Sequence, residues 1–364
     1  MGDDPSPDGA RPRSDTESGW NDLKIIVDAM GGDHAPLAPV EGALRAAAEL
    51  GVTVALTGQE EAVRAALAQC GHRDLPAGVE LIHTSEVITM EDDPATAFRR
   101  KKDSSMTVGL ELVKAGDGDA FVSAGSTGAL LTGATLLVKR IRGIRRAALA
   151  PVVPTMGGSM VLVDAGATAE CTPEYLLQYA FMGAYYARRF LGVPEPRVAL
   201  LNIGAEPTKG TDLQRTAHRL LTEADAAGRI RFVGNLEARE ALTVGADVLV
   251  ADGYAGNIFL KTYEGSAKFI TGMLKEMFLK SGKGKLAALT MKSDLADLKR
   301  MLDPSEVGGT PLLGISKPVI KAHGSADAYA FFNAIRQAMT VAESGLAADI
   351  EANIEHMRLP VDRA

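Results

Sequence analysis

Cysteine and long apolar runs are scarce in this sequence, and the charge balance is acidic. Two cysteines among 364 residues, Cys70 and Cys171, are too few for a disulfide framework and fit a reducing cytosol. A proline, glycine or charge interrupts every apolar stretch before the roughly 20 residues that a membrane-spanning helix needs. The net charge of −7 argues against binding nucleic acid over the whole surface, which requires a basic face. We therefore expect a cytoplasmic protein with no nucleic-acid partner.

The standard nucleotide-binding and metal-binding motifs are missing as well. The sequence has no P-loop, no H-E-x-x-H and no Cys/His metal spacing, and it lacks the G-x-S-x-G of many hydrolases. Residues 282–287 match G-x-G-x-x-G in letters, but they lie between two helical patterns instead of after a strand. We therefore expect neither a cofactor nor a metal ion.

The composition that remains is that of a globular protein, with 46% hydrophobic and 23% charged residues. The length allows two domains or one large α/β unit. Residues 1–22 are different, because they carry six acidic residues against two arginines and no apolar core segment. This composition predicts a disordered acidic tail, and ordered structure is expected from residue 23.

Five short apolar runs each end in a glycine-rich turn that carries polar side chains. They cover residues 24–27, 120–123, 160–163, 198–201 and 247–250, with helical patterns between them. Uninterrupted apolar strands that alternate with helices predict a parallel sheet covered on both faces. Ligands bind beyond the carboxyl ends of such strands. The five turns are therefore expected to converge on one rim and to form a site there.

The turn at residues 123–128, SAGSTG, is the strongest candidate for binding an anion. A turn of small residues that opens a helix presents free N–H groups and the positive end of the helix dipole to phosphate. Ser126 and Thr127 add hydroxyl donors. A tight capped turn without any ligand explains the same residues equally well.

Several cations follow the expected strands or gather in clusters. Lys209 lies after the turn at 202–206, and Lys317, Lys321 and His323 lie in the glycine-bounded segment 314–324. They suit a fixed anion, although a lone lysine is more often a solvated surface charge. The two basic clusters, at residues 99–102 and 139–146, indicate either a docking face for an acidic partner or a solvated helix face.

Residues 261–303 predict a helical hairpin, with apolar residues at helical spacing and a break at 281–284. Near the break, four lysines lie beside Leu286, Leu289 and Met291. This combination suits an anionic membrane surface. A dimer interface or core packing explains the pattern without a membrane.

Five motifs together resemble the PlsX family, the bacterial phosphate acyltransferases. They are DAMGGDHAP (28–36), RRKKDSSM (99–106), SAGSTGA (123–129), DGYAGN (252–257) and PVIKAHGS (318–325). The resemblance extends from about residue 25 to about residue 342. It implies a Rossmann-like α/β/α sandwich with a mostly parallel sheet, similar to phosphotransacetylases, over residues 23–345. The hairpin then protrudes as an insertion at about 261–303, and a C-terminal helix or tail occupies 346–364.

The resemblance also implies a function. A long-chain acyl group passes from acyl-acyl carrier protein to inorganic phosphate, and the acyl phosphate serves a glycerol-3-phosphate acyltransferase in phospholipid synthesis. A homodimer is implied, attached peripherally to the inner face of the cell membrane by the hairpin tip near Leu286 and Leu289. Ser126 departs from the asparagine that the family often has, and the acidic tail is extra. A coenzyme A-dependent phosphotransacetylase, a nicotinamide-dependent dehydrogenase and a non-catalytic membrane scaffold remain as alternatives.

The expected reaction needs alignment and charge stabilisation more than an activated side chain, because phosphate is itself a nucleophile and a thiolate leaves readily. Lys209 and the 123–128 loop are expected to hold phosphate, and Asn257 with the N–H groups near Gly31 and Gly32 to stabilise the oxyanion. Lys209, Asn257 and His34 are the expected catalytic residues. The expected substrate-binding residues are Asp28, Gly31, Gly32, Asp33, Ser123, Gly125, Ser126, Thr127, Gly128, Asp252, Gly253, Lys321 and His323.

Overall fold

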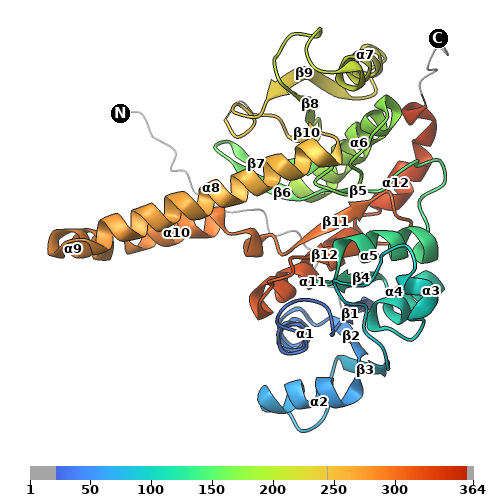
Figure 1. Ribbon diagram of the computed structural model, residues 1–364, viewed down its shortest axis with the longest axis vertical. Helices are drawn as coiled ribbons and strands as arrows, with labels where there is room; N and C mark the ends of the chain where they lie inside the picture. The colour runs from blue at the N-terminus through green and yellow to red at the C-terminus, as the bar shows by residue number, and fades with distance from the viewer. Residues whose placement is uncertain (1–21, 244, 359–364) are drawn as a thin grey trace, which may run out of the picture.

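Two sheets form the centre of the molecule. The computed structural model describes residues 22–243 and 245–358, so most of the expected acidic tail lies outside the described residues (Figure 1). The seven-stranded sheet has the order β3-β2-β1-β4-β12-β11-β5, and the five-stranded sheet has the order β6-β7-β10-β8-β9. Most neighbouring strands are parallel; β11 pairs antiparallel with β12 and β5, and β6 pairs antiparallel with β7. The expected α/β fold is confirmed.

The strands of the seven-stranded sheet are β1 (Lys24–Asp28), β2 (Thr53–Gly58), β3 (Val79–His83), β4 (Ala120–Ser123), β5 (Ala148–Leu149), β11 (Gly309–Leu313) and β12 (Val319–Ala322). Those of the five-stranded sheet are β6 (Val152–Thr155), β7 (Gly158–Val163), β8 (Arg197–Asn202), β9 (Arg231–Glu237) and β10 (Val248–Val250).

The helices alternate with these strands. They are α1 (Leu37–Leu50), α2 (Glu60–Gln69), α3 (Ala97–Arg100), α4 (Ser105–Ala115), α5 (Thr127–Gly133), α6 (Pro173–Tyr186), α7 (Asp212–Ala226), α8 (Gly253–Leu279), α9 (Gly282–Thr290), α10 (Lys292–Leu302), α11 (Ala328–Glu343) and α12 (Leu346–Ala352). Helix α5 continues into a π-helical turn, η2 (Ala134–Val138), and α6 into another, η3 (Ala187–Leu191).

The expectation of a single parallel sheet with one rim is wrong. The runs at 24–27 and 120–123 form strands of the seven-stranded sheet, whereas the other three belong to the five-stranded sheet. An apolar run indicates a strand buried on both faces, but it does not say which sheet the strand joins. The glycine-rich turns therefore lie on two sheets.

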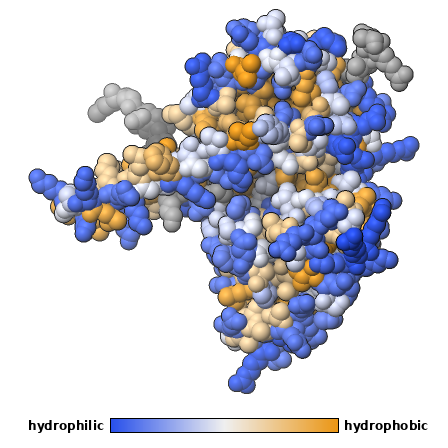
Figure 2. Space-filling view, in the orientation of Figure 1, coloured by the Kyte–Doolittle hydropathy of each residue, from blue (hydrophilic) through white to orange (hydrophobic). Residues whose placement is uncertain are grey.

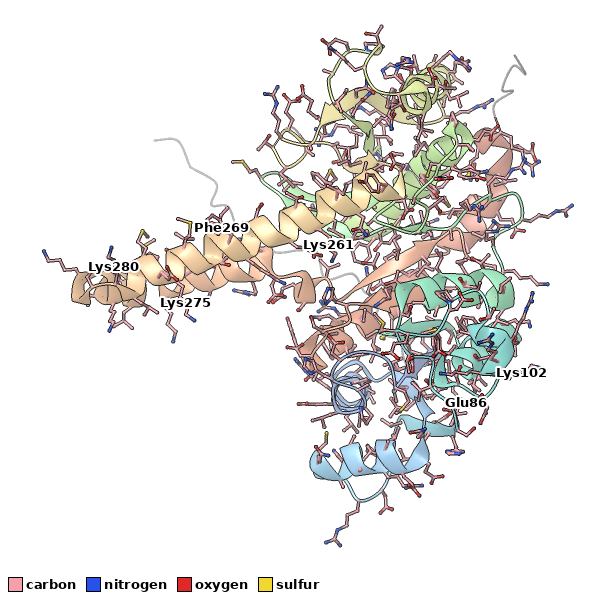
Figure 3. All side chains as sticks on the ribbon, viewed as in Figure 1. Glu86, Lys102, Lys261, Phe269, Lys275 and Lys280 are labelled. Atoms are coloured by element: carbon pink, nitrogen blue, oxygen red, sulfur yellow. The ribbon has the colours of Figure 1, made fainter. Side chains whose placement is uncertain are left out.

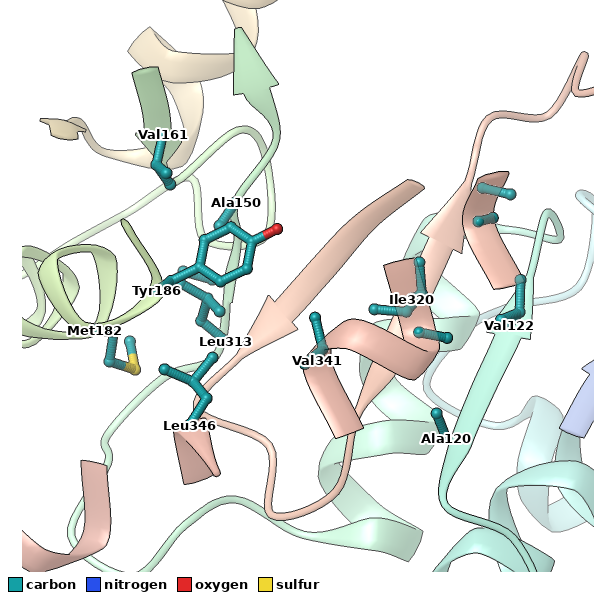
Figure 4. Packing of buried hydrophobic residues seen from close by; sticks show 14 of the residues in the cluster. Ala120, Val122, Ala150, Val161, Met182, Tyr186, Leu313, Ile320, Val341 and Leu346 are labelled. Carbon is teal, nitrogen blue, oxygen red and sulfur yellow. The ribbon is translucent and has the colours of Figure 1, made fainter. Parts of the chain in front are cut away.

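The hydrophobic core extends across both sheets. In β1, Ile25 and Val27 pack into one buried cluster and Ile26 into another, because successive side chains point to opposite faces. The first cluster also includes Tyr186 of α6 and Ile320 of β12, from the two halves of the molecule (Figure 4). The two sheets are therefore parts of one packed body.

The expected helical hairpin is present, and it projects from this body (Figure 1). Helix α8 begins at Gly253, eight residues before the expected start of the hairpin, and Ser281 then caps α9 by accepting a hydrogen bond from Gly284 N at 3.0 Å. Many apolar side chains of the hairpin, including Phe269, Met273, Leu286 and Leu289, are exposed, and Figure 2 shows hydrophobic surface along the arm. The arm is therefore not packed into the core of the same chain. Among the residues described, no helix has the length and apolar character needed to cross a membrane.

Candidate active site

A cleft of about 1910 Å³ is lined by residues of both halves of the molecule. The seven-stranded half contributes the turn after β4, with Thr127 and Gly128, and the segment after β12, with Lys321 and His323. The five-stranded half contributes Gly166, which follows β7, and the start of α8. The expected glycine-rich turns thus face one another across a cleft.

Asp28, at the end of β1, organises one wall of this cleft. Its Oδ2 accepts a hydrogen bond from Ser123 Oγ at 2.7 Å, and its Oδ1 accepts one from Met30 N at 3.1 Å. Ser123 Oγ in turn accepts a hydrogen bond from Gly125 N at 3.0 Å. Burial raises the pKa of the Asp28 carboxyl, because removal from water disfavours the charged form. Asp28 therefore holds the 123–125 turn from beneath.

Glycine is required at positions 31 and 32 by close packing. A Cβ at Gly31 would lie 2.7 Å from both Asp28 Oδ2 and Gly125 N. Gly32 has φ +104°, and a Cβ there would lie 2.9 Å from the Cβ of Ala124. The next residue, Asp33, donates its N–H to Gly324 O at 2.8 Å and lines the cleft. The turns after β1, β4 and β12 therefore form one interlocked wall.

Lys321 brings a part-buried ammonium group to this wall. Its Nζ donates to Ala124 O at 3.2 Å and also to Ala322 O. Burial lowers the pKa of Lys321 to about 8, while the nearby Asp28 and Asp33 act to raise it. No salt bridge to a carboxylate involves Lys321 in the described part of the chain. Its charge is therefore available to an anion in the cleft.

His323 and two residues of α8 add further charge. His323 Nδ1 lies 2.8 Å from Ser325 Oγ, and burial together with Lys261 lowers the pKa of the imidazole. Lys261 itself pairs with Glu264 at 2.8 Å, and all three side chains line the cleft. The cleft therefore brings Lys261, Lys321 and His323 together with the carboxylates of Asp33 and Glu264.

The 123–128 turn has the capped geometry that opens a helix. Ser126 caps α5 by accepting a hydrogen bond from Ala129 N at 3.4 Å, and its side chain is buried. Thr127 and Gly128 line the cleft, and a Cβ at Gly128 would lie 3.0 Å from Pro94 Cγ. Ser126 therefore has a structural role as the N-cap of α5, and the first turn of α5 faces the cleft.

On the opposite wall, Asp164 organises the turn after β7. Its Oδ1 accepts hydrogen bonds from the N–H groups of Leu149, Gly166 and Ala167 at 2.9–3.2 Å, and its Oδ2 accepts one from Thr168 N at 2.7 Å. Burial raises the pKa of Asp164 to about 6, against the lowering effect of these donors. The carboxylate thus anchors a whole turn by backbone contacts.

Asn257 lies on this wall in the second turn of α8, not in a turn before the helix as the sequence pattern indicated. Its Nδ2 donates to Ala165 O at 3.2 Å, which leaves the second amide hydrogen for another acceptor. Asp252 caps α8 by accepting hydrogen bonds from Tyr254 N and Ala255 N, and Gly253 N donates to Thr168 O at 2.9 Å. Asp252 and Gly253 thus set the position of Asn257.

Two of the three expected catalytic residues do not line the cleft. Lys209 lies exposed on the loop after β8, where it packs near Gly204. His34 is exposed between the turn after β1 and helix α1. The roles of both in catalysis stay predictions, whereas Asn257 lies in the cleft.

Sequence reasoning missed the other cleft-lining residues of α8. Leu260, Lys261, Tyr263 and Glu264 follow Asn257 by three, four, six and seven positions, and all of them line the cleft. Residues three, four and seven positions apart share one helix face. If residues 252–257 are taken as the start of a helix, this spacing predicts that Lys261 and Glu264 lie on the same helix face as Asn257.

Solved structures show that this is the fold of the phosphotransacetylases. EutD phosphotransacetylase from Staphylococcus aureus matches with a TM-score of 0.56 and 19% identity, covering 89% of this chain and 95% of that chain. A phosphotransacetylase from Streptococcus pyogenes matches with a TM-score of 0.58 and 20% identity, covering 88% of this chain and 94% of that chain. The fold therefore defines a phosphotransacetylase-like α/β protein.

Sequence comparison is more specific. The model of a family described as "Fatty acid synthesis protein" matches residues 23–349. The phosphate acyltransferase of Alkaliphilus oremlandii is 49% identical over 318 residues, which cover 87% of this chain and 93% of that relative. That of Geobacillus sp. (strain WCH70) is 47% identical over 335 residues, with 92% and 99% covered. The chain belongs to the phosphate acyltransferase family, which confirms the resemblance and makes it an acyltransferase.

Proposed function

We propose that this protein transfers a long-chain acyl group from acyl-acyl carrier protein to inorganic phosphate. The acyl phosphate then supplies a glycerol-3-phosphate acyltransferase in phospholipid synthesis. The observation that carries the proposal is the membership in the phosphate acyltransferase family, over nearly the whole length of relatives that are 47–49% identical. The cations, the Asn257 amide and the apolar side chains that line the cleft support the proposal.

The reaction is a direct displacement at the thioester. A phosphate oxygen attacks the carbonyl carbon, and the carbonyl oxygen carries the negative charge of the tetrahedral intermediate. The C–S bond then breaks, and the carrier protein leaves as its thiolate. Because phosphate brings its own nucleophilic oxygen, the protein contributes mainly alignment and charge stabilisation.

The two walls of the cleft divide these tasks. Phosphate binds at the wall of the seven-stranded half, beside Lys321 and the first turn of α5. Asn257, on the opposite wall, donates its free amide hydrogen to the oxyanion. Leu149, Val153 and Leu260 line the same cleft and provide apolar contacts for the acyl chain. Lys209 approaches phosphate from the rim, and His34 and His323 adjust protonation.

The hairpin attaches the protein to the membrane and contributes to a homodimer. At the tip, Leu286 is 64% exposed and Leu289 68% exposed, with Lys283 and Lys285 on the same helix α9. Apolar side chains beside basic ones bind an anionic lipid surface. Closer to the body, Phe269 and Met273 of α8 are exposed as well and suit contacts with a second copy.

The first experiment mixes the purified protein with a long-chain acyl-carrier protein, with and without inorganic phosphate. Hydroxylamine traps acyl phosphate as a hydroxamate, and released thiol is counted in parallel. We expect hydroxamate that depends on phosphate and equals the released thiol. Thiol release without phosphate means a thioesterase instead, and turnover only with acyl-coenzyme A means a phosphotransacetylase.

A second experiment tests the membrane role separately. Replacing Leu286 and Leu289 with glutamate is expected to release the protein from anionic liposomes in flotation, while turnover in solution stays unchanged. Val233→Glu on β9 is the control, because Val233 is also exposed but lies far from the hairpin in the chain. Unchanged flotation of the hairpin variant rules out the tip as the membrane contact.

A further inference from the structure

One flank of the molecule carries cations without carboxylate partners. Arg99, Arg100, Lys102, Lys139, Arg142 and Arg145, here called the cationic flank, are all exposed. Within residues 22–243 and 245–358, none of the six forms an ion pair, whereas Lys101, between them in the chain, pairs with Asp92 at 2.6 Å. This unneutralised charge stands out in a chain of net charge −7.

The fold places Arg99, Arg100 and Lys139 beside α4 and α5, while Arg145 lies next to α6, where its N–H donates to Gln178 Oε1 at 2.8 Å. Helix α3 ends in Arg99 and Arg100 and packs on α5, since a Cβ at Gly133 would lie 2.3 Å from Cζ of Phe98. The π-helical turn η2 packs against α4 and leads directly into Lys139. Figure 1 shows α3, α4 and α5 side by side at the right of the molecule. Leu136, 54% exposed on η2, adds an apolar contact beside these charges.

Helix α5 and its continuation η2 extend from the active cleft to the cationic flank. Thr127, Gly128 and Leu131 of α5 line the cleft, while Lys139 follows its far end. The 12 residues from 127 to 138 span about 18 Å at 1.5 Å per residue. A substrate that reaches the cleft on a flexible arm can therefore keep its carrier on the flank.

Lys102 of the cationic flank lies on the side of the molecule opposite the hairpin. Lys102 lies on the right of Figure 3, whereas Lys275 and Lys280 of the hairpin lie on the far left. A flat membrane that contacts the hairpin tip is therefore distant from the flank. This arrangement favours a protein partner over a lipid surface.

We propose that the cationic flank is the docking surface for the acidic protein that carries the acyl thioester. The proposal rests on the proposed function, because it concerns the donor of that same reaction. Unpaired cations attract an acidic surface over a distance and orient it on encounter. Leu136 then contacts the carrier, and the arm enters the cleft along Leu131.

The test reverses charge on the cationic flank at sites far from the reacting groups. We use two variants, Arg142→Glu with Arg145→Glu, and Arg99→Glu with Lys102→Glu, so that a folding defect in one does not decide the result. The control, Arg73→Glu with Arg231→Glu, makes the same charge change at exposed cations outside the flank. Steady-state kinetics are measured with acyl-carrier protein and, separately, with a small acyl thioester of pantetheine.

We expect both flank variants to raise the KM for acyl-carrier protein at least tenfold, with the KM for phosphate and the turnover of the small thioester unchanged. A KM equal to that of the control overturns the docking proposal and leaves the proposed function intact. If the flank variants lose binding to anionic vesicles while the KM for acyl-carrier protein is unchanged, the flank binds lipid. This result also overturns the docking proposal. If the unaltered protein uses only the small thioester, the carrier-protein donor itself is wrong.

Discussion

Two buried aspartates, Asp28 and Asp164, each lie at the end of a strand shortly before a glycine, but their hydrogen-bond donors differ. Asp28 ends β1 and is followed by Ala-Met-Gly; Asp164 follows β7 and precedes Ala-Gly. Asp164 accepts four hydrogen bonds, all from backbone N–H groups. Asp28 accepts one from the Ser123 hydroxyl and one from Met30 N, and it interacts electrostatically with Lys321.

The difference shows how one local motif serves both structure and chemistry. A carboxylate whose hydrogen bonds all come from backbone donors fixes the shape of a turn, as Asp164 does. A carboxylate joined to a hydroxyl and near an ammonium group influences the charge of the site. Asp164 therefore supports the wall that carries Asn257, whereas Asp28 acts on the wall that carries Lys321, where we propose that phosphate binds.

The largest expected effect is the loss of stability on replacing Asp164 with alanine. Four backbone donors then lose their acceptor in a buried turn, which costs about 3 kcal/mol or more of unfolding free energy. Urea unfolding followed by circular dichroism measures this change. Asp28→Ala is the matched comparison and loses fewer hydrogen bonds; an equal loss in the two variants contradicts the distinction.

Lys321→Met is expected to impair the reaction more than the fold. If the Lys321 ammonium group contacts phosphate as proposed, its removal is expected to lower kcat/KM for phosphate by about 100-fold, corresponding to about 2.7 kcal/mol. The KM for the acyl donor is expected to change little, because the donor contacts other residues. Steady-state kinetics in both substrates check this, and equal effects on the two substrates exclude a phosphate-specific role.

The pH dependence follows from the lowered pKa of Lys321. Only the protonated lysine attracts phosphate, and its pKa is about 8 in the free protein. We therefore expect kcat/KM for phosphate to fall above pH 8, by roughly tenfold at pH 9. Lys321→Arg stays protonated throughout this range and should remove the decline. If the decline persists in Lys321→Arg, the titration of another group causes it.

The smallest expected effect is a shift of this decline in Asp28→Asn. The Asp28 carboxylate raises the pKa of Lys321, so its neutral amide analogue lets that pKa fall further. The decline in kcat/KM for phosphate should then begin at a lower pH, by less than about one unit. Asp164→Asn provides the control, and a shift of equal size there removes the difference between the two aspartates.

Much of this architecture follows from the sequence, and the exceptions have physical causes. The apolar runs identify β1, β4, β7, β8 and β10, but the boundary between the sheets is formed by short edge strands. β5 has two residues, and prolines stand between β5 and β6 and within β6, so neither strand is set apart as a run with its own glycine-rich turn. A pattern of runs therefore predicts the class of fold and not the division into two sheets.

The sequence predicts part of the candidate site, as it predicts part of the fold. The sequence pattern indicates Ser123, Lys321 and Asn257, because each follows or ends a recognisable strand or turn; Lys321 and Asn257 line the cleft, and their roles stay predictions. Lys261 was missed because Asp252 caps a helix where a loop was expected, which places Lys261 one turn beyond Asn257. Lys209 follows a strand like the others, yet the long loop after β8 leaves it exposed, and loop paths are not encoded in local patterns.

Helix α8 carries Asn257 near one end and leads to the hairpin tip at the other. Its 27 residues form a rod of about 40 Å. At its base a Cβ on Gly256 would lie 1.9 Å from Asp164 O, so the rod is seated directly on the Asp164 turn. The base of the rod, where Asn257 lies, is therefore fixed to the turn that Asp164 organises. We expect a tilt of the far end of the arm to move the Asn257 amide as well.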